Sequence, residues 1–308
     1  MPQEKWFALI NPVSGFGKAE KKRKAIEAEL KRQHIAFDFR FTTATAHADV
    51  LIQEEIQNGF RKFICVGGDG NLHDMVNGIM RQNTVPSTAI TLAMISLGTG
   101  NDWIKTSGVP KDIRGAIALI KQERTMLQNA GAATCFLNGK ETTTYFHNFA
   151  GVGFDAYVVA RTTSLKTYGQ AAYLLGMLKC LFTYQKPVLK ITVDDEVLET
   201  VCYLTLAGIG KYGGGGMKLT PGAALDGDGF FVSIAKNFSR LDVFRHIAKL
   251  YNGKFIHLPE AETRFAKKIR IELLSATQEV FMEADGDLLG TGPFEISMLP
   301  KALRVVIP

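Results

Sequence analysis

A glycine-rich stretch near residue 70 constrains the fold of this chain more than any other feature. Residues 63–66 are four apolar residues that predict a short buried strand, and three glycines around Asp69 end it abruptly. Apolar residues then recur at helical spacing from Leu72 to Ile79. Glycines let the main chain approach a ligand closely, and a helix N-terminus favours phosphate oxygens. The pattern therefore predicts an anion-binding loop between a strand and a helix.

Asp69 is the unexpected residue of this loop. A carboxylate beside a phosphate site repels its ligand unless a cation or a hydrogen-bond donor lies between them. Two interpretations follow: Asp69 binds Mg²⁺, or it holds the loop through hydrogen bonds. For an isolated glycine motif, a plain turn with Asp69 capping the helix that it begins is the simpler alternative.

Two further strand ends carry similar loops. A buried strand over residues 6–10 leads into a turn with Pro12 and Gly15 and a charged helix over 19–33, and a strand over 89–96 leads into a Gly-Thr-Gly-Asn-Asp loop before a helix over 111–122. Between them lie a strand over 36–41 and a helix over 48–58. This order predicts parallel strand–helix–strand units with ligands at the carboxyl ends of the strands. Turn chemistry alone would also explain each loop taken singly.

The chain beyond residue 128 has a different pattern of short, β-branched, alternating runs. They predict an antiparallel sandwich, with a hairpin formed by residues 189–193 and 196–201. The other expected strands cover residues 142–149, 202–207, 230–234, 269–274 and 279–283.

Three segments of this second half are open to more than one interpretation. Helices over residues 171–183 and 241–251 are apolar enough to touch lipid, although packing on the sandwich is the usual role of such stripes. The four glycines from Gly213 to Gly216 predict a flexible loop, either a flap near the site or a simple surface loop.

Composition limits the remaining choices. A chain of 308 residues suggests two domains, and its net charge of +6 suits anionic partners such as nucleotide phosphates or a membrane surface. No aromatic-basic motif for nucleic acid, no HExxH zinc motif and no GxxxxGK[ST] or GxSxG motif occurs. Four widely spaced cysteines in apolar contexts predict reduced, buried thiols and a cytoplasmic protein. No apolar run reaches the roughly 20 residues of a membrane span, so we expect any membrane to be approached from the water side.

The order and spacing of these motifs resemble one known family. Together with residues 148–155, 225–230 and 285–287, the glycine loops are similar to those of bacterial diacylglycerol kinases and YegS-type lipid kinases. That family shares its catalytic domain with eukaryotic diacylglycerol, sphingosine and ceramide kinases. The resemblance implies an α/β plus β fold. Residues 1–128, plus about 295–308, would form an NAD-kinase-like parallel α/β domain that binds nucleotide. Residues 129–294 would form a β-sandwich domain that binds the lipid. The last strand would return to the first domain, and the nucleotide would bind between the two domains.

The resemblance also implies an activity, which is ATP-dependent and Mg²⁺-dependent transfer of the γ-phosphoryl group to a lipid hydroxyl. Diacylglycerol is the first acceptor to expect, and another lipid alcohol, such as phosphatidylglycerol or a sphingoid base, is the alternative. A homologue that binds nucleotide or lipid without turnover is a further alternative. The expected partner is a lipid at the inner face of a membrane, to which the protein would bind peripherally. No nucleic-acid partner is expected, and a homodimer is possible.

The family's functional residues map onto particular positions here. The residues that would bind ATP lie in the loops and are Asn11, Pro12, Ser14, Gly15, Thr42, Gly67, Gly68, Asp69, Gly70, Asn71, Leu72, His73, Thr99, Asn101 and Asp102. A structural Mg²⁺ would be bound by the side chain of Asp228 and by the main-chain carbonyls of Leu225 and Phe230. This sequence has one extra residue in the turn, so Asp226 is the alternative side-chain ligand.

The expected general base is Asp287, aided by Asp285. Three positions depart from the family pattern: Asp287 and Asp74 stand where Glu is usual, and Asn71 stands where Thr is usual. An aspartate at position 287 keeps the carboxylate on a side chain shorter by one methylene, so either a small shift restores the reach of the base or the base is weaker.

Overall fold

The computed structural model describes residues 4–12, 14–42, 47–98, 100–162 and 170–308. The chain folds into two compact units. Unit 1 comprises residues Met1–Ala130, Gly214–Gly216 and Leu299–Pro308, and unit 2 comprises Gly131–Gly213 and Met217–Met298. The domain boundaries inferred from the sequence, 128 and about 295, lie close to the ends of these segments at Ala130 and Leu299. The short segment Gly214–Gly216 was not expected in unit 1.

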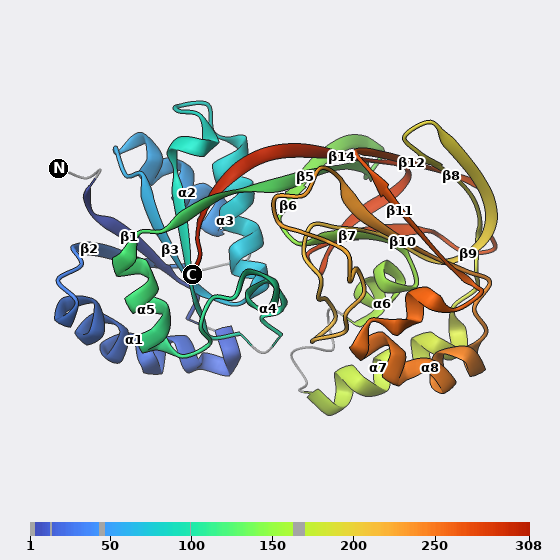
Figure 1. The fold of residues 1–308 in the computed structure, drawn as a ribbon, viewed down its shortest axis with the longest axis horizontal. Coiled ribbons are helices and arrows are strands. Elements are labelled where there is room, and N and C mark those ends of the chain that lie inside the picture. Colours follow the sequence, from blue (N-terminus) through green and yellow to red (C-terminus); the bar gives the residue numbers. More distant parts are fainter. Residues whose placement is uncertain (1–3, 13, 43–46, 99, 163–169) are drawn as a thin grey trace. The chain divides into compact units, whose positions relative to one another are not determined.

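Unit 1 is built around a sheet of parallel pairs (Figure 1). Its strands follow the order β2, β1, β3, β4 and the end of β14. Its elements are β1 (Trp6–Ile10), α1 (Ser14–Arg32), β2 (Phe37–Phe41), α2 (His47–Gln57), β3 (Lys62–Gly67), α3 (Asp69–Arg81), η2 (Ser87–Ala89), β4 (Thr91–Ser96), α4 (Asp102–Ser107), α5 (Ile113–Gln122), and parts of the long strands β5 (Thr125–Leu137) and β14 (Asp287–Val306).

Burial explains why three of these strands read as continuous apolar runs. Every residue of β1 is buried, as is nearly every residue of β3 and β4, because a parallel sheet is covered on both faces. β2 lies at the edge of the sheet and alternates half-buried with exposed residues, as its sequence predicts. The carboxyl ends of these parallel strands therefore meet along one edge of the sheet, where the loops of the candidate site begin.

Helices α2 and α3 pack closely because of one glycine. A side chain at Gly78 would overlap that of Ile52, and its Cβ would lie 2.6 Å from the carbonyl oxygen of Asp49. Arg81 at the end of α3 donates to the Asp49 carboxylate over 2.7 Å, which ties the same two helices together. The contact orients α3, whose first residue is Asp69.

Unit 2 is β-rich, and its strand pairs are antiparallel (Figure 1). One path follows the order β11, β10, β9, β7, β13 and β14, while β8 and β12 pair with each other and β5 pairs with β6. Its elements are β6 (Lys140–Phe146), β7 (Phe149–Gly153), α6 (Phe154–Thr162), α7 (Gln170–Thr183), β8 (Val188–Val193), β9 (Glu196–Gly208), β10 (Phe230–Lys236), α8 (Arg240–Asn252), η4 (Lys254–His257), β11 (Ala261–Ala266), β12 (Lys268–Ser275) and β13 (Phe281–Ala284).

The hairpin of β8 and β9 is confirmed, with Val193 opposite Glu196 across the turn. One expected strand is wrong at its end, since residues 142–149 do not form a single strand. His147 and Asn148 bend between β6 and β7 because their backbone amides donate to the carboxylate of Asp285 and not to a neighbouring strand. The expected strand over 202–207 is the inner part of the much longer β9.

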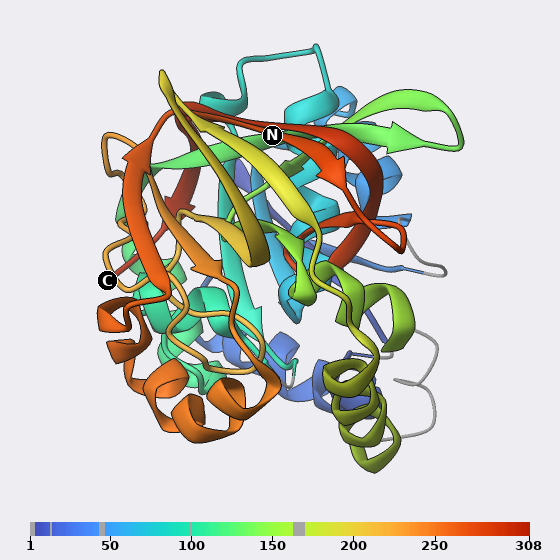
Figure 2. The same cartoon turned by 90° about the vertical axis from the view of Figure 1, so that its right-hand side faces the viewer.

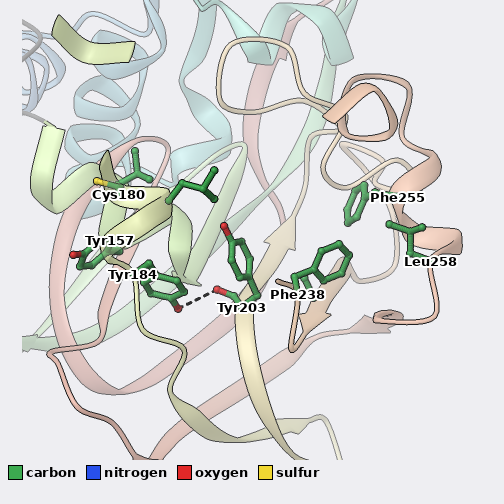
Figure 3. Packing of buried hydrophobic residues seen from close by; sticks show 10 residues of the cluster. Tyr157, Cys180, Tyr184, Tyr203, Phe238, Phe255 and Leu258 are labelled. Carbon is green, nitrogen blue, oxygen red and sulfur yellow. Dashed lines mark hydrogen bonds between the residues drawn. The ribbon is translucent and has the colours of Figure 1, made fainter. Parts of the chain in front are cut away.

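A cluster of aromatic side chains forms part of the core of unit 2 (Figure 3). Tyr184 donates its hydroxyl to the carbonyl oxygen of Tyr203 over 3.0 Å, so its polar atom is satisfied inside the cluster. Phe238, Phe255 and Leu258 extend the cluster towards α8 and η4. In both ribbon views α6, α7 and α8 lie at the same end of unit 2 (Figures 1 and 2).

The four cysteines are free and buried, as expected. Burial raises the pKa of each thiol, that of Cys202 to about 12, so these groups stay protonated and unreactive at neutral pH. Among the described residues, no helix combines the length and the apolar composition that crossing a bilayer requires.

Candidate active site

Two glycine loops meet at the edge of the sheet of unit 1. Gly67 ends β3, and its carbonyl oxygen accepts hydrogen bonds from Leu97 and Gly98, over 2.7 and 3.1 Å. A Cβ on Gly98 would lie 2.6 Å from the Cα of Gly68. Only glycines permit this approach, so the loops after β3 and β4 pack backbone against backbone.

Asp69 joins the two loops. Its carboxylate accepts hydrogen bonds from the backbone amides of Asp102 and Trp103, over 3.0 and 3.4 Å. These are the first amides of α4, so Asp69 caps the helix that follows the other loop. It does not cap α3, whose N-cap residue is Gly68. These hydrogen bonds match the interpretation in which Asp69 holds the loop.

The second loop is fixed at each of its last two residues. Asn101 adopts the left-handed conformation, with φ at 49°, and donates its side-chain amide to the carbonyl oxygen of Gly98 over 2.6 Å. Asp102 accepts the Lys105 ammonium over 2.6 Å and the backbone amide of Gly215 over 2.8 Å. Asp102 therefore holds the tip of the glycine run.

The glycine run is a tight hairpin and was expected to be a flexible loop. Gly213 and Met217 exchange two backbone hydrogen bonds, over 2.9 and 3.0 Å. The three residues between them, Gly214, Gly215 and Gly216, all have positive φ, at 58°, 85° and 111°. Three such residues in succession explain why the sequence uses only glycine there.

The N-terminus of α3 has the backbone amides that could bind an anion. The first hydrogen bond of the helix joins the Leu72 amide to the Gly68 carbonyl, so the preceding amides have no partner within the helix. Gly70 is exposed, and a Cβ on it would meet no atom of the described residues within 4 Å. Open space therefore adjoins the helix N-terminus, which is where phosphate oxygens bind most favourably.

Several residues assigned to ATP binding support this loop from behind. Asn71 is 4% exposed, and its amide nitrogen lies 3.3 Å from Cys65 Sγ and 3.5 Å from the Leu9 carbonyl oxygen. Leu72 and His73 are also buried on α3. The donor that replaces the usual hydroxyl at position 71 is thus turned towards β1 and β3.

The remaining assigned residues lie around the same edge or outside the described residues. Asn11 and Thr42 follow β1 and β2, and their backbone amides donate to the carbonyls of Val66 and Ile10 over 3.2 and 2.9 Å. Pro12 is half-buried, and Ser14 and Gly15 begin α1. Thr99 lies outside the described residues.

The candidate catalytic residues lie in unit 2, at the turn between β13 and β14. Asp285, with φ at 52°, accepts the backbone amides of His147, Asn148 and Phe149 over 3.0, 3.0 and 3.1 Å. Its carboxylate also lies 2.8 Å from Nδ1 of His147, and its side chain is only 1% exposed. The oxygens of Asp285 therefore hold the bend between β6 and β7, and its role beside Asp287 stays a prediction.

Asp287 differs from Asp285 in its exposure to solvent. It is the first residue of β14 and is exposed, whereas Asp285 two residues earlier is enclosed. An exposed carboxylate on a turn fixed by a buried one is the arrangement that a general base needs, since the base must reach its proton donor.

Two carboxyl groups whose role the sequence did not predict lie behind this turn. Glu283 on β13 accepts the Gly286 amide over 2.7 Å and is 1% exposed. It stands opposite Gly151 on β7, and the carboxyl group of Asp155 at the start of α6 lies over the same glycine. An acidic residue directly after an apolar strand was the signal that could have drawn attention to Asp155.

The two carboxyl groups interact inside unit 2, and burial makes their ionisation costly. Burial raises the pKa of Asp155 to about 6. Burial and then the charge of Asp155 raise the pKa of Glu283 well above its usual value. The pair therefore retains a proton at pH values where exposed carboxyl groups are ionised.

The candidate metal-binding turn precedes β10. Asp226 and Asp228 are both exposed, and the Gly227 amide donates to the Ala224 carbonyl over 3.1 Å, which closes the turn. Leu225 is buried, and Phe230 begins β10 opposite Ala266. Exposed carboxylates beside main-chain carbonyls are a donor set that fits a hard divalent cation.

Two family models match the chain. The model of the diacylglycerol kinase catalytic domain matches residues 5–132. The model of the YegS C-terminal NAD kinase beta sandwich-like domain matches residues 148–307.

Relatives and solved structures are similar over nearly the whole chain. A diacylglycerol kinase of Mycobacterium tuberculosis is 29% identical over 98% of this chain and 94% of its own length, and one of Staphylococcus haemolyticus is 29% identical over 97% and 87%. The crystal structure of a diacylglycerol kinase from Bacillus anthracis superposes with a TM-score of 0.72 at 24% identity, over 99% of this chain and 97% of that chain. Yeast NADH kinase complexed with NADH shares the fold, with a TM-score of 0.56 at 12% identity over 99% and 83%.

The chain belongs to the class of proteins with an NAD-kinase-like fold, with a mixed α/β part and a β-rich part. Within this class the chain belongs to the family of bacterial diacylglycerol kinases and YegS-type lipid kinases, since the two family models together match most of its length. The family and the enzyme class expected from the motifs are therefore confirmed, and the protein is a lipid kinase.

Proposed function

We propose that the protein transfers the γ-phosphoryl group of ATP to the hydroxyl of diacylglycerol, which yields phosphatidic acid and ADP. The names of relatives support this acceptor, because several that are similar over nearly the whole chain are diacylglycerol kinases, although one of Bacillus subtilis is named only a putative lipid kinase. The acceptor's acyl chains lie in a bilayer, so the reaction would take place peripherally, at the inner face of a membrane.

One observation carries the ATP assignment, which is the contact between the two glycine loops of unit 1. Gly68 and Gly98 pack against each other, and Asp69 caps α4 from the first loop. The N-terminus of α3 then adjoins open space at Gly70. Backbone amides and a helix dipole in this arrangement favour the phosphates of a nucleotide. Asn11 and Thr42, at the ends of β1 and β2, would bound the same site.

Phosphoryl transfer requires a group that accepts the proton of the attacking hydroxyl. Asp287 is our candidate for this base: its carboxylate takes the proton while the lipid oxygen bonds to the γ-phosphorus and the bond to ADP breaks. Asp285 would act as a positioning residue, since its carboxylate holds three backbone amides.

Mg²⁺ would supply charge neutralisation for the nucleotide phosphates and, at the turn before β10, structural support. Asp228 would hold the structural ion with the carbonyls of Leu225 and Phe230, and Asp226 is the alternative ligand. Thermal unfolding in Mg²⁺ and in EDTA tests this role. We expect Mg²⁺ to raise the Tm of the wild type and of Asp226→Ala but not of Asp228→Ala. The reverse pattern would assign the ion to Asp226, and an equal rise in all three proteins would remove it from this turn.

The decisive experiment follows labelled γ-phosphate from Mg-ATP into lipids in mixed micelles. Diacylglycerol, phosphatidylglycerol and a sphingoid base form the acceptor panel. Wild type should label diacylglycerol, Asp287→Ala should lose about 10²-fold or more of that rate, and Asp287→Glu should retain it. Asp195→Ala changes an exposed aspartate on the hairpin turn of the same unit and is the matched control. Label in another lipid would change the acceptor, and full activity of Asp287→Ala would remove the base.

A further inference from the structure

The outer faces of α7 and α8 expose more large apolar side chains than a solvated surface requires. On α7, Leu175 and Phe182 are 67% and 56% exposed. On α8, Leu241 and Ile247 are 71% and 53% exposed, and Phe244 and Tyr251 are exposed as well. None of the 13 residues of α8 is buried. A regular helix of this composition normally packs its apolar stripe against a partner.

The two helices form one continuous surface. The rings of Phe182 and Phe244 lie 6.3 Å apart, and the guanidinium of Arg240 lies 6.0 Å from the ring centroid of Phe182. Both ribbon views place α7 and α8 at the same end of unit 2 (Figures 1 and 2). We call this surface the α7–α8 face and define it by Leu175, Leu178, Phe182, Leu241, Phe244, Ile247 and Tyr251.

Well-formed caps show that α8 is a stable helix. Ser239 accepts the amide of Asp242, and the Asp242 side chain accepts the amide of Ser239, which is a reciprocal capping box. Gly253 ends the helix in the left-handed conformation, with φ at 77°. The exposed side chains therefore stand on a defined scaffold and are not part of a frayed segment.

The charges around the face are mainly positive. α7 and α8 together contain Lys179, Arg240, Arg245 and Lys249, against Asp242 as the single acidic residue. The Asp242 carboxylate accepts the amide and the hydroxyl of Ser239 and lies 3.9 Å from the Arg245 guanidinium, so it offsets only one of these four positive charges. A surface that combines exposed apolar side chains with basic ones fits the interface of an anionic bilayer.

A cavity of about 450 Å³ opens at the edge of this face and has the same combination of chemistry. Tyr184, Tyr203 and Phe238 contribute apolar walls, and Figure 3 shows these three side chains near one another. Lys186 and Arg240 also line the cavity. Lys186 donates to three neutral oxygens, which are the side-chain and main-chain oxygens of Asn237 and the carbonyl oxygen of Phe238, and no ion pair of Lys186 is found in the described part of the chain. None of these contacts neutralises its positive charge, which favours an anion nearby.

From these observations we infer that the α7–α8 face docks on the surface of an anionic lipid bilayer. This inference rests on the proposed function, because a kinase whose acceptor lies in a bilayer must reach that bilayer. The other candidate occupant is a second copy of the chain. Charge disfavours it, since a symmetric contact through this face would bring the arginines and lysines of two copies together.

Vesicle flotation with and without phosphatidylglycerol tests the docking surface directly. Wild type should bind vesicles of phosphatidylcholine with 30% phosphatidylglycerol and bind pure phosphatidylcholine at least about tenfold more weakly. Leu241→Gln/Ile247→Gln should weaken binding to the anionic vesicles about tenfold or more, because it removes two side chains that insert among the lipids. Arg245→Gln/Lys249→Gln should remove most of the dependence on phosphatidylglycerol.

The matched control is Leu273→Gln/Leu274→Gln on β12, where the leucines are 48% and 49% exposed outside this face. It should bind vesicles within about twofold of wild type. Docking through α7 and α8 is wrong if the control and the α8 variants lose binding equally, or if the α8 variants bind as wild type does. A dimer in lipid-free solution that Leu241→Gln/Ile247→Gln converts to a monomer would assign the face to a second copy.

A short-chain, water-soluble diacylglycerol separates this inference from the proposed function. The α8 variants should phosphorylate it at the wild-type rate, because no bilayer is involved. Wild type that binds anionic vesicles but phosphorylates none of the lipids would overturn the acceptor assignment and leave the docking surface standing.

Discussion

At the scale of single residues, the acidic side chains of the candidate site divide into those that hold backbone amides and those that face solvent. Asp69 holds the first amides of α4, and Asp285 holds the bend between β6 and β7. Asp287 is exposed. A sequence motif shows three aspartates among glycines and does not distinguish these roles, because the partner amides lie 33 and more than 130 residues away along the chain.

We predict that Asp69→Ala weakens nucleotide binding about tenfold or more. The change removes the acceptor for the amides of Asp102 and Trp103, so the second glycine loop loses its fixed position. Asp112→Ala is the matched control, because Asp112 caps α5 through the Gly115 amide over 2.8 Å, outside the loops. Each variant should lose ~1 kcal/mol of stability. Isothermal titration with ATP checks the difference, and equal affinities in the two variants would contradict it.

A second prediction concerns the pH dependence of stability set by Asp155 and Glu283. The pKa of Asp155 rises to about 6 on folding and that of Glu283 rises well above its usual value. Between pH 4 and 7 the folded chain therefore binds more protons at this pair than the unfolded chain does. The stability that the protonated pair provides is present below about pH 4 and is lost as the pH rises through 6 and beyond.

Glu283→Gln should reduce this loss, because an amide keeps an acceptor for the Gly286 amide but carries no charge. Each unit of pKa change corresponds to ~1.4 kcal/mol, so the wild type should lose on the order of 1–3 kcal/mol more than the variant between pH 4.5 and 7. Urea unfolding at several pH values measures the difference. Glu272→Gln, at an exposed position on β12, is the control and should follow the wild type.

At the scale of elements, the packing of α2 against α3 depends on Gly78. We predict that Gly78→Val destabilises the protein by about 1–3 kcal/mol, since the new side chain would overlap Ile52 and the backbone at Asp49. Among the residues that the structure describes, the added methyl group of Gly70→Ala on the same helix meets no atom within 4 Å, so the stability of this variant should not fall. Urea midpoints of the two variants check this prediction. Similar losses in both would contradict the prediction, because the overlap with Ile52 and Asp49 would then not explain the loss at position 78.

The elements that the sequence predicts best are those whose pattern is decided locally. The parallel-sheet strands β1, β3 and β4 are buried throughout, so continuous apolar runs identify them. The bend at His147 and Asn148 could not be predicted, because a carboxylate distant in the sequence causes it. The hairpin shape of the glycine run was not predicted for the same reason, since its tip bonds to Asp102, over a hundred residues away.

The candidate site could be located from the sequence, but the tasks of its residues could not. Glycine loops at strand ends mark the place, since strand, loop and helix are contiguous in the chain. That Asn71 turns its amide towards Leu9 and Cys65 depends on how β1 packs beside β3. Likewise, the interaction of Glu283 with Asp155 arises only when β13 pairs with β7.

At the scale of the whole molecule, the last ten residues complete the sheet of the first unit. Residues 299–308 belong to unit 1, where Arg304 and Val305 pair in parallel with Thr91 and Leu92 of β4. Deletion of these residues should expose the edge of β4 and abolish nucleotide binding. Hydrogen exchange of β4 and ATP titration measure both effects. Adding a peptide of residues 299–308 should restore affinity, and a truncated protein that binds ATP normally would contradict the prediction.

The same strand has a consequence for how the protein is made. A ribosome releases residues 1–130 long before it releases Val305, and at 5–20 residues per second the delay is on the order of ten seconds or more. During that interval β4 has no neighbour on its outer side, and its backbone groups are open to pairing with any other strand. The sheet of unit 1 thus stays incomplete until residues 299–308 have been synthesised, and until then the open edge of β4 is exposed to aggregation.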